Sequence, residues 1–176
     1  MTDIAVRLAG PDDYAAVGAL REAAYSHDYE ISGRYRESLR DAAPRGTGQE
    51  VWVAVERHTG RLLGTVVTPR PGGHISELGQ DAELDFRLLA VDPAARRRGI
   101  GRLLVEHVIA LAAERGDERV VMNSGAQMTG AHQLYYSMGF SRLAERETRT
   151  VPGHTRPLLA FGYDLAGHGM ADGTRF

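Results

Sequence analysis

Residues 91–104 read Val91-Asp92-Pro93-Ala94-Ala95-Arg96-Arg97-Arg98-Gly99-Ile100-Gly101-Arg102-Leu103-Leu104. An apolar strand leads here into a turn rich in arginine and glycine, and an amphipathic helix follows directly. Backbone N–H groups in the first turn of a helix have no partner inside the helix, and the helix dipole adds partial positive charge there. Glycine lets an anionic group approach the backbone closely. We therefore expect this turn to bind a phosphate-bearing cofactor.

The spacing of the glycines argues against the common nucleotide motifs. A dinucleotide-binding turn needs a third glycine, but Leu104 stands at that position after Gly99 and Gly101. A Walker-type loop needs a lysine, and the chain has none, because all 21 of its Lys and Arg residues are arginine. The alternative without a ligand is an ordinary strand-to-helix turn with solvated arginines.

The composition is that of an ordinary globular protein. The chain has 176 residues, of which 43% are hydrophobic and 25% are charged. This length suits one compact domain, which we place at residues 1–165, followed by a flexible C-terminal tail at residues 166–176. No apolar run approaches the ~20 residues of a membrane-spanning helix, and the N-terminus lacks the pattern of a signal peptide. We therefore expect a cytoplasmic protein that does not bind membranes.

Several kinds of chemistry are excluded by composition. The absence of cysteine excludes disulfides, thiolate metal sites and a cysteine nucleophile, and the absence of lysine excludes Schiff-base catalysis. The seven histidines show no metal-binding spacing, so we expect no metal. The formal net charge of -2 argues against a nucleic-acid partner, because Arg96 to Arg98 form only a local basic patch.

Periodicity along the chain predicts a mixed α/β domain. The predicted strands cover residues 4–8, 51–55, 62–67, 83–91, 119–123 and 158–165, and the predicted helices cover about 11–24, part of 31–42, 99–115 and 129–138. A helix between the strands at 83–91 and 119–123 requires a right-handed crossover between parallel strands. The arginine- and glycine-rich turn then lies at the carboxyl end of the first of these strands, where ligands bind in such folds.

A second motif extends the pattern. Residues 131–140 read Ala131-His132-Gln133-Leu134-Tyr135-Tyr136-Ser137-Met138-Gly139-Phe140. Together with Arg96-x-x-Gly99-x-Gly101, this A-x-x-L-Y-x-x-x-G-F pattern resembles the GNAT superfamily of acetyl-CoA-dependent N-acetyltransferases, and the element order fits from about residue 3 to 165. The resemblance implies a GNAT-like fold, with a central mixed sheet of six to seven strands that is splayed between its fourth and fifth strands and flanked by about four helices.

The resemblance also implies acetyl-CoA as the cofactor and a set of residues that bind it. The backbone of the fourth strand would bond the pantetheine arm, and the turn after it would bind the diphosphate. These residues are Leu89, Ala90, Val91, Arg96, Arg97, Arg98, Gly99, Ile100, Gly101 and Arg102. Many family members have an asparagine where this chain has Met128, which removes one polar contact to the pantetheine. Asn123 and Gln127 are candidates to replace that contact, and we include Asn123 in the cofactor site.

Catalytic residues are implied by the same resemblance. Family members place a general base at positions that match either Glu83 or Asp85, with Glu83 slightly favoured here. The alternative is that both acids are solvated and paired with Arg87 on one face of the strand. A backbone N–H near Leu89 or Ala90 would stabilise the tetrahedral oxyanion.

The implied general acid is a phenol. Tyr135 would protonate the departing thiolate, because a phenol stays protonated at neutral pH. The alternative role of Tyr135 is core packing beside Leu134 and Phe140.

The acceptor site is less clearly encoded. Tyr25 and Tyr29 are candidate acceptor-binding residues, because the first two helices wall the acceptor site in the family. His74 is a third candidate, because the loop from Pro69 to Ala82 that contains it could cover the site. We expect an N-acetyltransferase that acts on a primary amine of a small molecule or peptide. A direct ternary complex is expected because no cysteine can carry the acyl group. The alternative is a non-catalytic GNAT-like module that binds acyl-CoA as a sensor. Separately, edge strands near the C-terminus make a homodimer plausible.

Overall fold

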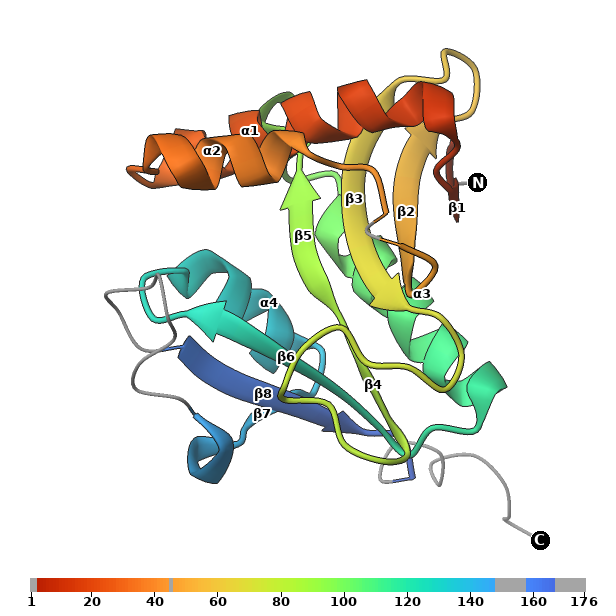
Figure 1. The fold of residues 1–176 in the computed structure, drawn as a ribbon, viewed down its shortest axis with the longest axis vertical. Helices are drawn as coiled ribbons and strands as arrows, with labels where there is room; N and C mark the ends of the chain where they lie inside the picture. Colours follow the sequence, from red (N-terminus) through yellow and green to blue (C-terminus); the bar gives the residue numbers. More distant parts are fainter. Residues whose placement is uncertain (1–2, 45, 148–157, 167–176) are drawn as a thin grey trace, which may run out of the picture. The chain divides into compact units, whose positions relative to one another are not determined.

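The computed structural model describes residues 3–44, 46–147 and 158–166 (Figure 1). Its elements in chain order are β1 (Ile4–Leu8), η1 (Pro11–Asp13), α1 (Tyr14–Asp28), α2 (Gly33–Arg40), β2 (Gln49–Glu56), β3 (Leu62–Pro69), β4 (Glu83–Asp85), β5 (Arg87–Val91), η2 (Pro93–Ala95), α3 (Ile100–Arg115), β6 (Arg119–Gly125), α4 (Thr129–Ser137), β7 (Ser141–Arg142), η3 (Ala144–Arg146) and β8 (Leu158–Asp164). The chain divides into two compact units, the first made of Met1–Ile75 and Phe86–His107 and the second of Ser76–Asp85 and Val108–Phe176.

The first unit is an antiparallel sheet with the strand order β1-β2-β3-β5. Strands β2 and β3 form the hairpin that the sequence predicts, with Val51 opposite Val67 and Val53 opposite Thr65. Helix α1 buries Val17 against this sheet. The core of the unit is therefore built from the valine-rich strands and one stripe of α1, as the three- to four-residue periodicity of the helix requires.

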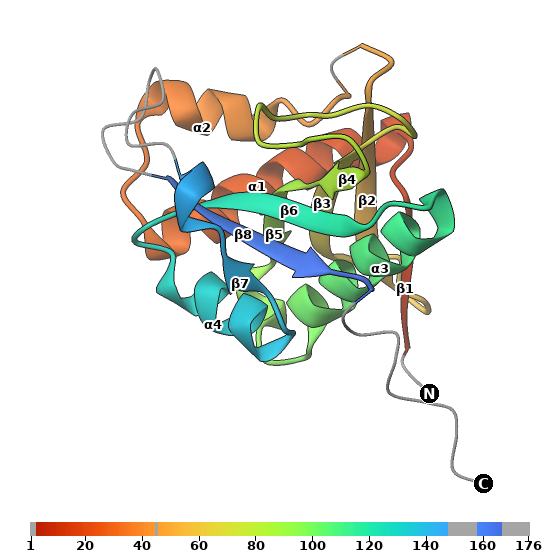
Figure 2. The ribbon, with the colours of Figure 1, turned by 90° about the horizontal axis from the view of Figure 1, so that it is seen from below.

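The second unit is a mixed sheet with the strand order β4-β6-β8-β7. Strands β4 and β6 are parallel, with Glu83 beside Arg119 and Asp85 beside Val121, whereas β8 runs antiparallel to β6. Figure 2 shows β6 and β8 side by side, with α4 next to them. The parallel pairing confirms the crossover expected from the sequence, and the mixed α/β class with about four helices is confirmed as well.

One predicted strand is wrong in detail. Residues 83–91 form two short strands, because β4 pairs with β6 in one sheet and β5 pairs with β3 in the other. Leu88 has a φ of 54°. A left-handed residue interrupts the alternation of side chains on which the sequence prediction of one continuous face depended. Strands thus fall into two four-stranded sheets among the described residues.

Other expectations fall outside what the structure describes. Residues 167–176 of the expected tail are not among the described residues. In the described ranges, no helix is both long and apolar enough to span a bilayer.

Gly18 is required for the close packing of α1 on α2. A Cβ atom at this position would overlap the backbone carbonyl oxygen of Arg40 and lie 2.9 Å from its carbonyl carbon. We expect Gly18→Ala to lower the free energy of unfolding by about 2–3 kcal/mol, because backbone cannot move aside cheaply. Urea unfolding measures this, with Gly33→Ala as the matched helix control, since nothing lies within 4 Å of a Cβ at Gly33. Equal stability of the two variants would contradict the packing.

Candidate active site

The turn between β5 and α3 is built to expose backbone N–H groups. An Asp92 carboxylate oxygen accepts the Ala94 N–H at 3.0 Å and starts the short helix η2. The chain then passes through Arg97 at a φ of 63° and Gly99 at a φ of 75°. A left-handed arginine costs of order 1 kcal/mol, and such strained residues cluster at functional sites.

The first turn of α3 follows immediately. The first α-helical hydrogen bond at this end runs from the Leu103 N–H to the Gly99 carbonyl at 3.0 Å. The N–H groups of Ile100 and Gly101 precede that bond and have no acceptor within the helix. Partial positive charge is therefore available here for an anionic ligand.

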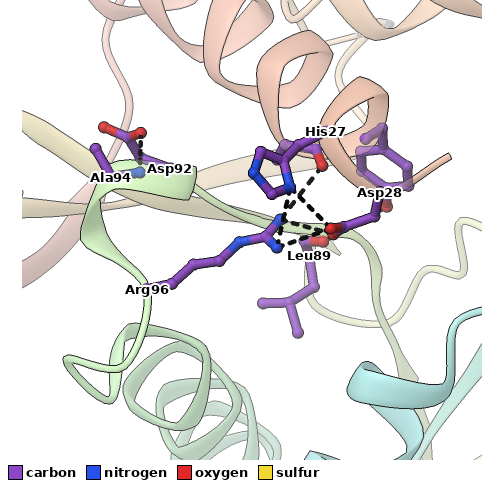
Figure 3. A network of polar contacts seen from close by, with 8 residues as sticks. His27, Asp28, Leu89, Asp92, Ala94 and Arg96 are labelled. Atoms are coloured by element: carbon purple, nitrogen blue, oxygen red, sulfur yellow. Dashed lines mark hydrogen bonds and ion pairs between the residues drawn. The ribbon is translucent and has the colours of Figure 1, made fainter.

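Arg96 anchors this turn to the end of α1. Its guanidinium makes two hydrogen bonds to the Asp28 carboxylate, Nη1 to Oδ1 at 2.9 Å and Nη2 to Oδ2 at 2.7 Å (Figure 3). His27 Nδ1 lies 2.9 Å from the same carboxylate and 3.5 Å from Arg96 Nη1. The hydrogen bonds from Arg96 lower the pKa of Asp28 to about 2. The first arginine of the motif is thus engaged within the protein.

The neighbouring arginines differ in their partners. Arg98 Nη2 pairs with a Glu56 carboxylate oxygen at 3.2 Å, and Arg61 Nη2 binds Asp92 Oδ2 at 2.8 Å. No hydrogen bond or ion pair engages Arg97 within residues 3–44, 46–147 and 158–166. Of the three consecutive arginines, Arg97 is therefore the one whose charge is available to a ligand. Arg102 lies in the first turn of α3.

Strand β5 offers an unpaired sheet edge. It is the last strand in the order β1-β2-β3-β5, with Ala90 beside Thr65 and Val91 beside Gly64 on its paired side. An extended ligand can add to such an edge through backbone hydrogen bonds. The Leu89 carbonyl accepts a long hydrogen bond of 3.5 Å from the Tyr25 hydroxyl.

In the second unit, Glu83 is held in an ion pair. Arg146 binds both of its carboxylate oxygens, at 2.9 and 2.7 Å, and the Gln80 N–H adds a bond of 3.1 Å. Arg119 Nη1 lies 3.6 Å from the same carboxylate. Burial alone would raise the pKa of Glu83, but these hydrogen bonds and positive charges outweigh it and hold the pKa below its usual value. The expected partner Arg87 instead donates to the Ile75 carbonyl at 3.4 Å.

Asp85 occupies a different environment. It is fully buried, and the Ser76 hydroxyl donates to its Oδ2 at 2.7 Å. A hydroxyl is a weaker partner than a guanidinium, because it carries no charge.

Tyr135 lies in an aromatic cluster. Its side chain is 3% exposed, and its ring centroid lies 5.7 Å from the rings of both Phe140 and Phe161. The neighbouring Tyr136 is 51% exposed. Packing thus fixes the direction of the Tyr135 ring.

A buried polar pair next to Tyr135 was not foreseen from the sequence. His132 Nε2 lies 3.1 Å from the Ser124 hydroxyl, which also approaches the Met128 sulfur at 3.6 Å. Burial lowers the pKa of His132, so the ring is neutral at pH 7. No motif signals this pair, since one residue lies in β6 and the other in α4. Arg146 was missed for the same reason, as it lies far from Glu83 in the chain.

Among the buried polar atoms without a hydrogen-bond partner in the described residues, those of Asn123 and Arg21 bear on the site. The amide oxygen Oδ1 of Asn123 has no hydrogen-bond donor among the described residues, and neither Nε nor Nη2 of Arg21 has an acceptor there. Burial lowers the pKa of Arg21 to about 10, so it stays charged at neutral pH. Gln127 is exposed, and its amide packs over Gly125.

The candidate acceptor residues are divided among different elements. Tyr25 of α1 meets Tyr35 of α2 edge-on, with ring centroids 6.1 Å apart. Tyr29 follows α1 directly, and burial raises its pKa. His74 lies in the exposed segment that follows β3. In the described part of the chain, no group of three or more histidine or acidic side chains could hold a metal ion.

Comparison with known proteins gives a consistent picture. The acetyltransferase (GNAT) domain family matches residues 47–142. The chain is 34% identical to N-acetylaspartate synthetase of Danio rerio over 113 residues, which are 64% of this chain and 37% of that protein. It is 29% identical to the peptidyl-lysine N-acetyltransferase YjaB of Escherichia coli over 139 residues, 78% of this chain and 80% of that protein. The chain spans less than two fifths of the N-acetylaspartate synthetases that it matches.

Solved structures show the same fold. An acetyltransferase of the GNAT family from Staphylococcus aureus superimposes with a TM-score of 0.70 at 15% identity, over 92% of this chain and 99% of that one. A putative acetyltransferase of the GNAT family from Desulfovibrio desulfuricans superimposes with a TM-score of 0.72 at 15% identity, over 92% of this chain and 98% of that one.

The Glu83 ion pair predicts a pH-dependent contribution to stability. Its pKa is lowered in the folded state, so the stabilisation is present above the unfolded value near 4.5 and is lost as the pH falls through the folded pKa. We expect Glu83→Gln to lower the free energy of unfolding by about 2–3 kcal/mol at neutral pH, because Arg146 loses its charged partner.

Urea unfolding at neutral pH and below about pH 4 measures this difference. Glu145→Gln, an exposed acid in the same helix as Arg146, is the control and should change stability little. A Glu83→Gln defect that is equally large in acid would contradict the ion pair as its cause.

Proposed function

The chain belongs to the GNAT acetyltransferase family, and we propose that it transfers the acetyl group of acetyl-CoA to a primary amine of a small molecule or a peptide. The observation that carries this proposal is the turn before α3. It combines first-turn N–H groups, a left-handed Arg97 with no partner among the described residues and an Arg96 that anchors the backbone to α1. Such a donor set suits a diphosphate, because it pairs backbone amides with one available guanidinium.

The cofactor would be held by two features of the first unit. The amides from Arg97 to Arg102 would bind the diphosphate, and the unpaired edge of β5 would bond the pantetheine amides. Acetyl-CoA supplies a thioester whose carbonyl carbon can be attacked by a neutral amine. A backbone N–H at Leu89 or Ala90 is the proposed oxyanion donor, worth about 3 kcal/mol of transition-state stabilisation.

We assign the general base to Asp85 rather than Glu83. Both oxygens of Glu83 are bound by Arg146, and its lowered pKa makes it a weaker base. Asp85 lies two residues further along the same short strand, and the Ser76 hydroxyl donates a hydrogen bond to it. Its carboxylate would take the proton of the acceptor ammonium, which leaves the nitrogen lone pair able to attack.

Tyr135 is the proposed general acid. Its ring is fixed between Phe140 and Phe161, so its hydroxyl has a defined direction. The phenol would give its proton to the thiolate as the carbon–sulfur bond breaks. Transfer within one ternary complex is proposed because the chain has no cysteine to carry the acyl group.

Acceptor turnover tests the function. Similar proteins are named for acetylation of aspartate, of peptidyl lysine and of a ribosomal-protein alanine. Aspartate, a lysine-containing peptide and a peptide with N-terminal alanine therefore form the first panel. We expect thiol release with at least one of them and intersecting initial-rate patterns. Tyr135→Phe should lower kcat by about 100-fold and leave acetyl-CoA affinity unchanged.

Binding without turnover across a broad amine panel would favour the sensor alternative. An unchanged kcat in Tyr135→Phe would leave Tyr135 a packing residue. Parallel initial-rate patterns would contradict a direct ternary complex.

The turn before α3 leads to a separate prediction. Arg97→Ala should weaken acetyl-CoA binding about 10-fold, because it removes one charge-assisted hydrogen bond to phosphate. Calorimetry measures the Kd, and Arg34→Ala, an exposed arginine of α2, controls for the change in net charge. Equal effects of the two variants would show that Arg97 acts only through the net charge of the protein and makes no direct contact with the phosphate.

A further inference from the structure

The amide of Asn123 is an unsatisfied acceptor in the middle of the second unit. Its Oδ1 is buried and receives no hydrogen bond from the described residues. An unsatisfied buried acceptor costs about 1–3 kcal/mol, so native proteins rarely keep one without a function. The missing partner must be a donor.

Neighbouring side chains are occupied elsewhere. Ser124, the next residue in β6, points to the opposite face of the strand and lies within hydrogen-bond distance of His132. Gln127 packs over Gly125 on the exposed loop. The local structure therefore does not supply the donor that Asn123 lacks.

The sheet register places Asn123 on the same face as Asp85. Asp85 lies directly beside Val121 in the parallel pair of β4 and β6. Asn123 comes two residues after Val121, so its side chain projects from the same face, roughly 7 Å further along the strand. Across the antiparallel pair with β8, the residue opposite Asn123 is Ala160, whose methyl group offers no hydrogen-bond donor. The Asp85 carboxylate and the Asn123 amide oxygen are thus two hydrogen-bond acceptors on the same face of the sheet.

We propose that the Asn123 amide oxygen accepts a hydrogen bond from the acceptor amine and thereby selects primary amines. This inference rests on the proposed function. A primary ammonium has three N–H donors, which suits a carboxylate and an amide oxygen that can only accept. One proton passes to Asp85, a second passes to solvent as the amide forms, and one N–H remains on the nitrogen of the product. Asn123 can hold that last N–H throughout the reaction, so it is a positioning residue.

Secondary amines are disfavoured for the same reason. An N-methylated acceptor has no N–H left once the carbon–nitrogen bond has formed and the nitrogen has lost its protons. Acetylation of such an amine would leave the Asn123 oxygen without a hydrogen bond. The free-energy cost would be similar to that of the unpaired oxygen in this structure. Discrimination between a primary amine and its N-methyl analogue is therefore the specific signature of this contact.

The test compares Asn123→Leu with Ser124→Ala. Replacing an amide whose buried oxygen has no hydrogen bond with an apolar side chain of similar size should raise the Tm. Loss of the satisfied Ser124 hydroxyl should lower it. We expect Asn123→Leu to lower kcat/KM for the primary amine about 10-fold and to abolish its preference over the N-methyl analogue. Ser124→Ala should keep that preference. Asn123→Asp, which retains an oxygen acceptor, should restore part of it.

Three outcomes would overturn the inference. In the first, Asn123→Leu keeps the primary-amine preference, and the amide is then structural. In the second, acetyl-CoA binds more weakly to Asn123→Leu while the preference is kept, and the missing donor then belongs to the cofactor. In the third, calorimetry with CoA present shows equal amine affinity for wild type and Asn123→Leu. Because that measurement needs no turnover, it tests Asn123 even where wild type transfers no acetyl group and the proposed function itself fails.

Discussion

The ion pair between Arg96 and Asp28 is the interaction on which the first unit's ligand-binding turn depends. A helix N-terminus binds an anion only when its amides are held in one direction, and a turn with left-handed residues at 97 and 99 has no regular hydrogen-bond ladder to hold it. Two charge-assisted bonds to the last residue of α1 supply that restraint (Figure 3). The Arg96 and Asp28 side chains are each 36% exposed, so water screens the attraction between their charges. The pair therefore restrains the turn mainly through the geometry of its two parallel hydrogen bonds.

The partners of the polar residues separate structural from chemical roles. Guanidinium groups are well suited to fix carboxylates, because their planar donors match both oxygens, and this lysine-free chain uses them widely for that purpose. Arg96, Arg98 and Arg146 each hold an acid, whereas Arg97 does not. Residues that satisfy each other belong to the framework. Groups left without partners, at a free-energy cost, are the better candidates for ligand contact.

Arg21 shows where that reasoning stops. It is 2% exposed with two nitrogen atoms unpaired, yet Asp41 lies near enough to favour its charge. Gly18 brings α1 against the carboxyl end of α2, and a helix C-terminus carries partial negative charge. The charge of Arg21 is thus compensated by its surroundings without a direct bond. The Asn123 oxygen carries no formal charge, and no described residue donates a hydrogen bond to it.

Local sequence patterns predicted most of the fold and the turn before α3, because both depend on contacts within a few residues. The valine-rich hairpin, the helix stripes and the glycines at 99 and 101 are signals of this kind. The roles of the two acids were not predictable, since the Arg146 that engages Glu83 lies 63 residues away. Nothing in the spacing of residues 83–91 reveals that β4 and β5 pair with different strands.

The division of that segment has a chemical consequence. A single continuous strand would place Glu83, Asp85, Arg87 and Leu89 on one face, where the acids and Arg87 could neutralise one another. With Leu88 at a φ of 54°, the acids remain with β6 while β5 completes the other sheet. Asp85 thereby belongs to the second unit, where the Ser76 hydroxyl donates a hydrogen bond to it. Glu83 in the same short strand is instead held by Arg146, so the two acids of β4 differ in their partners.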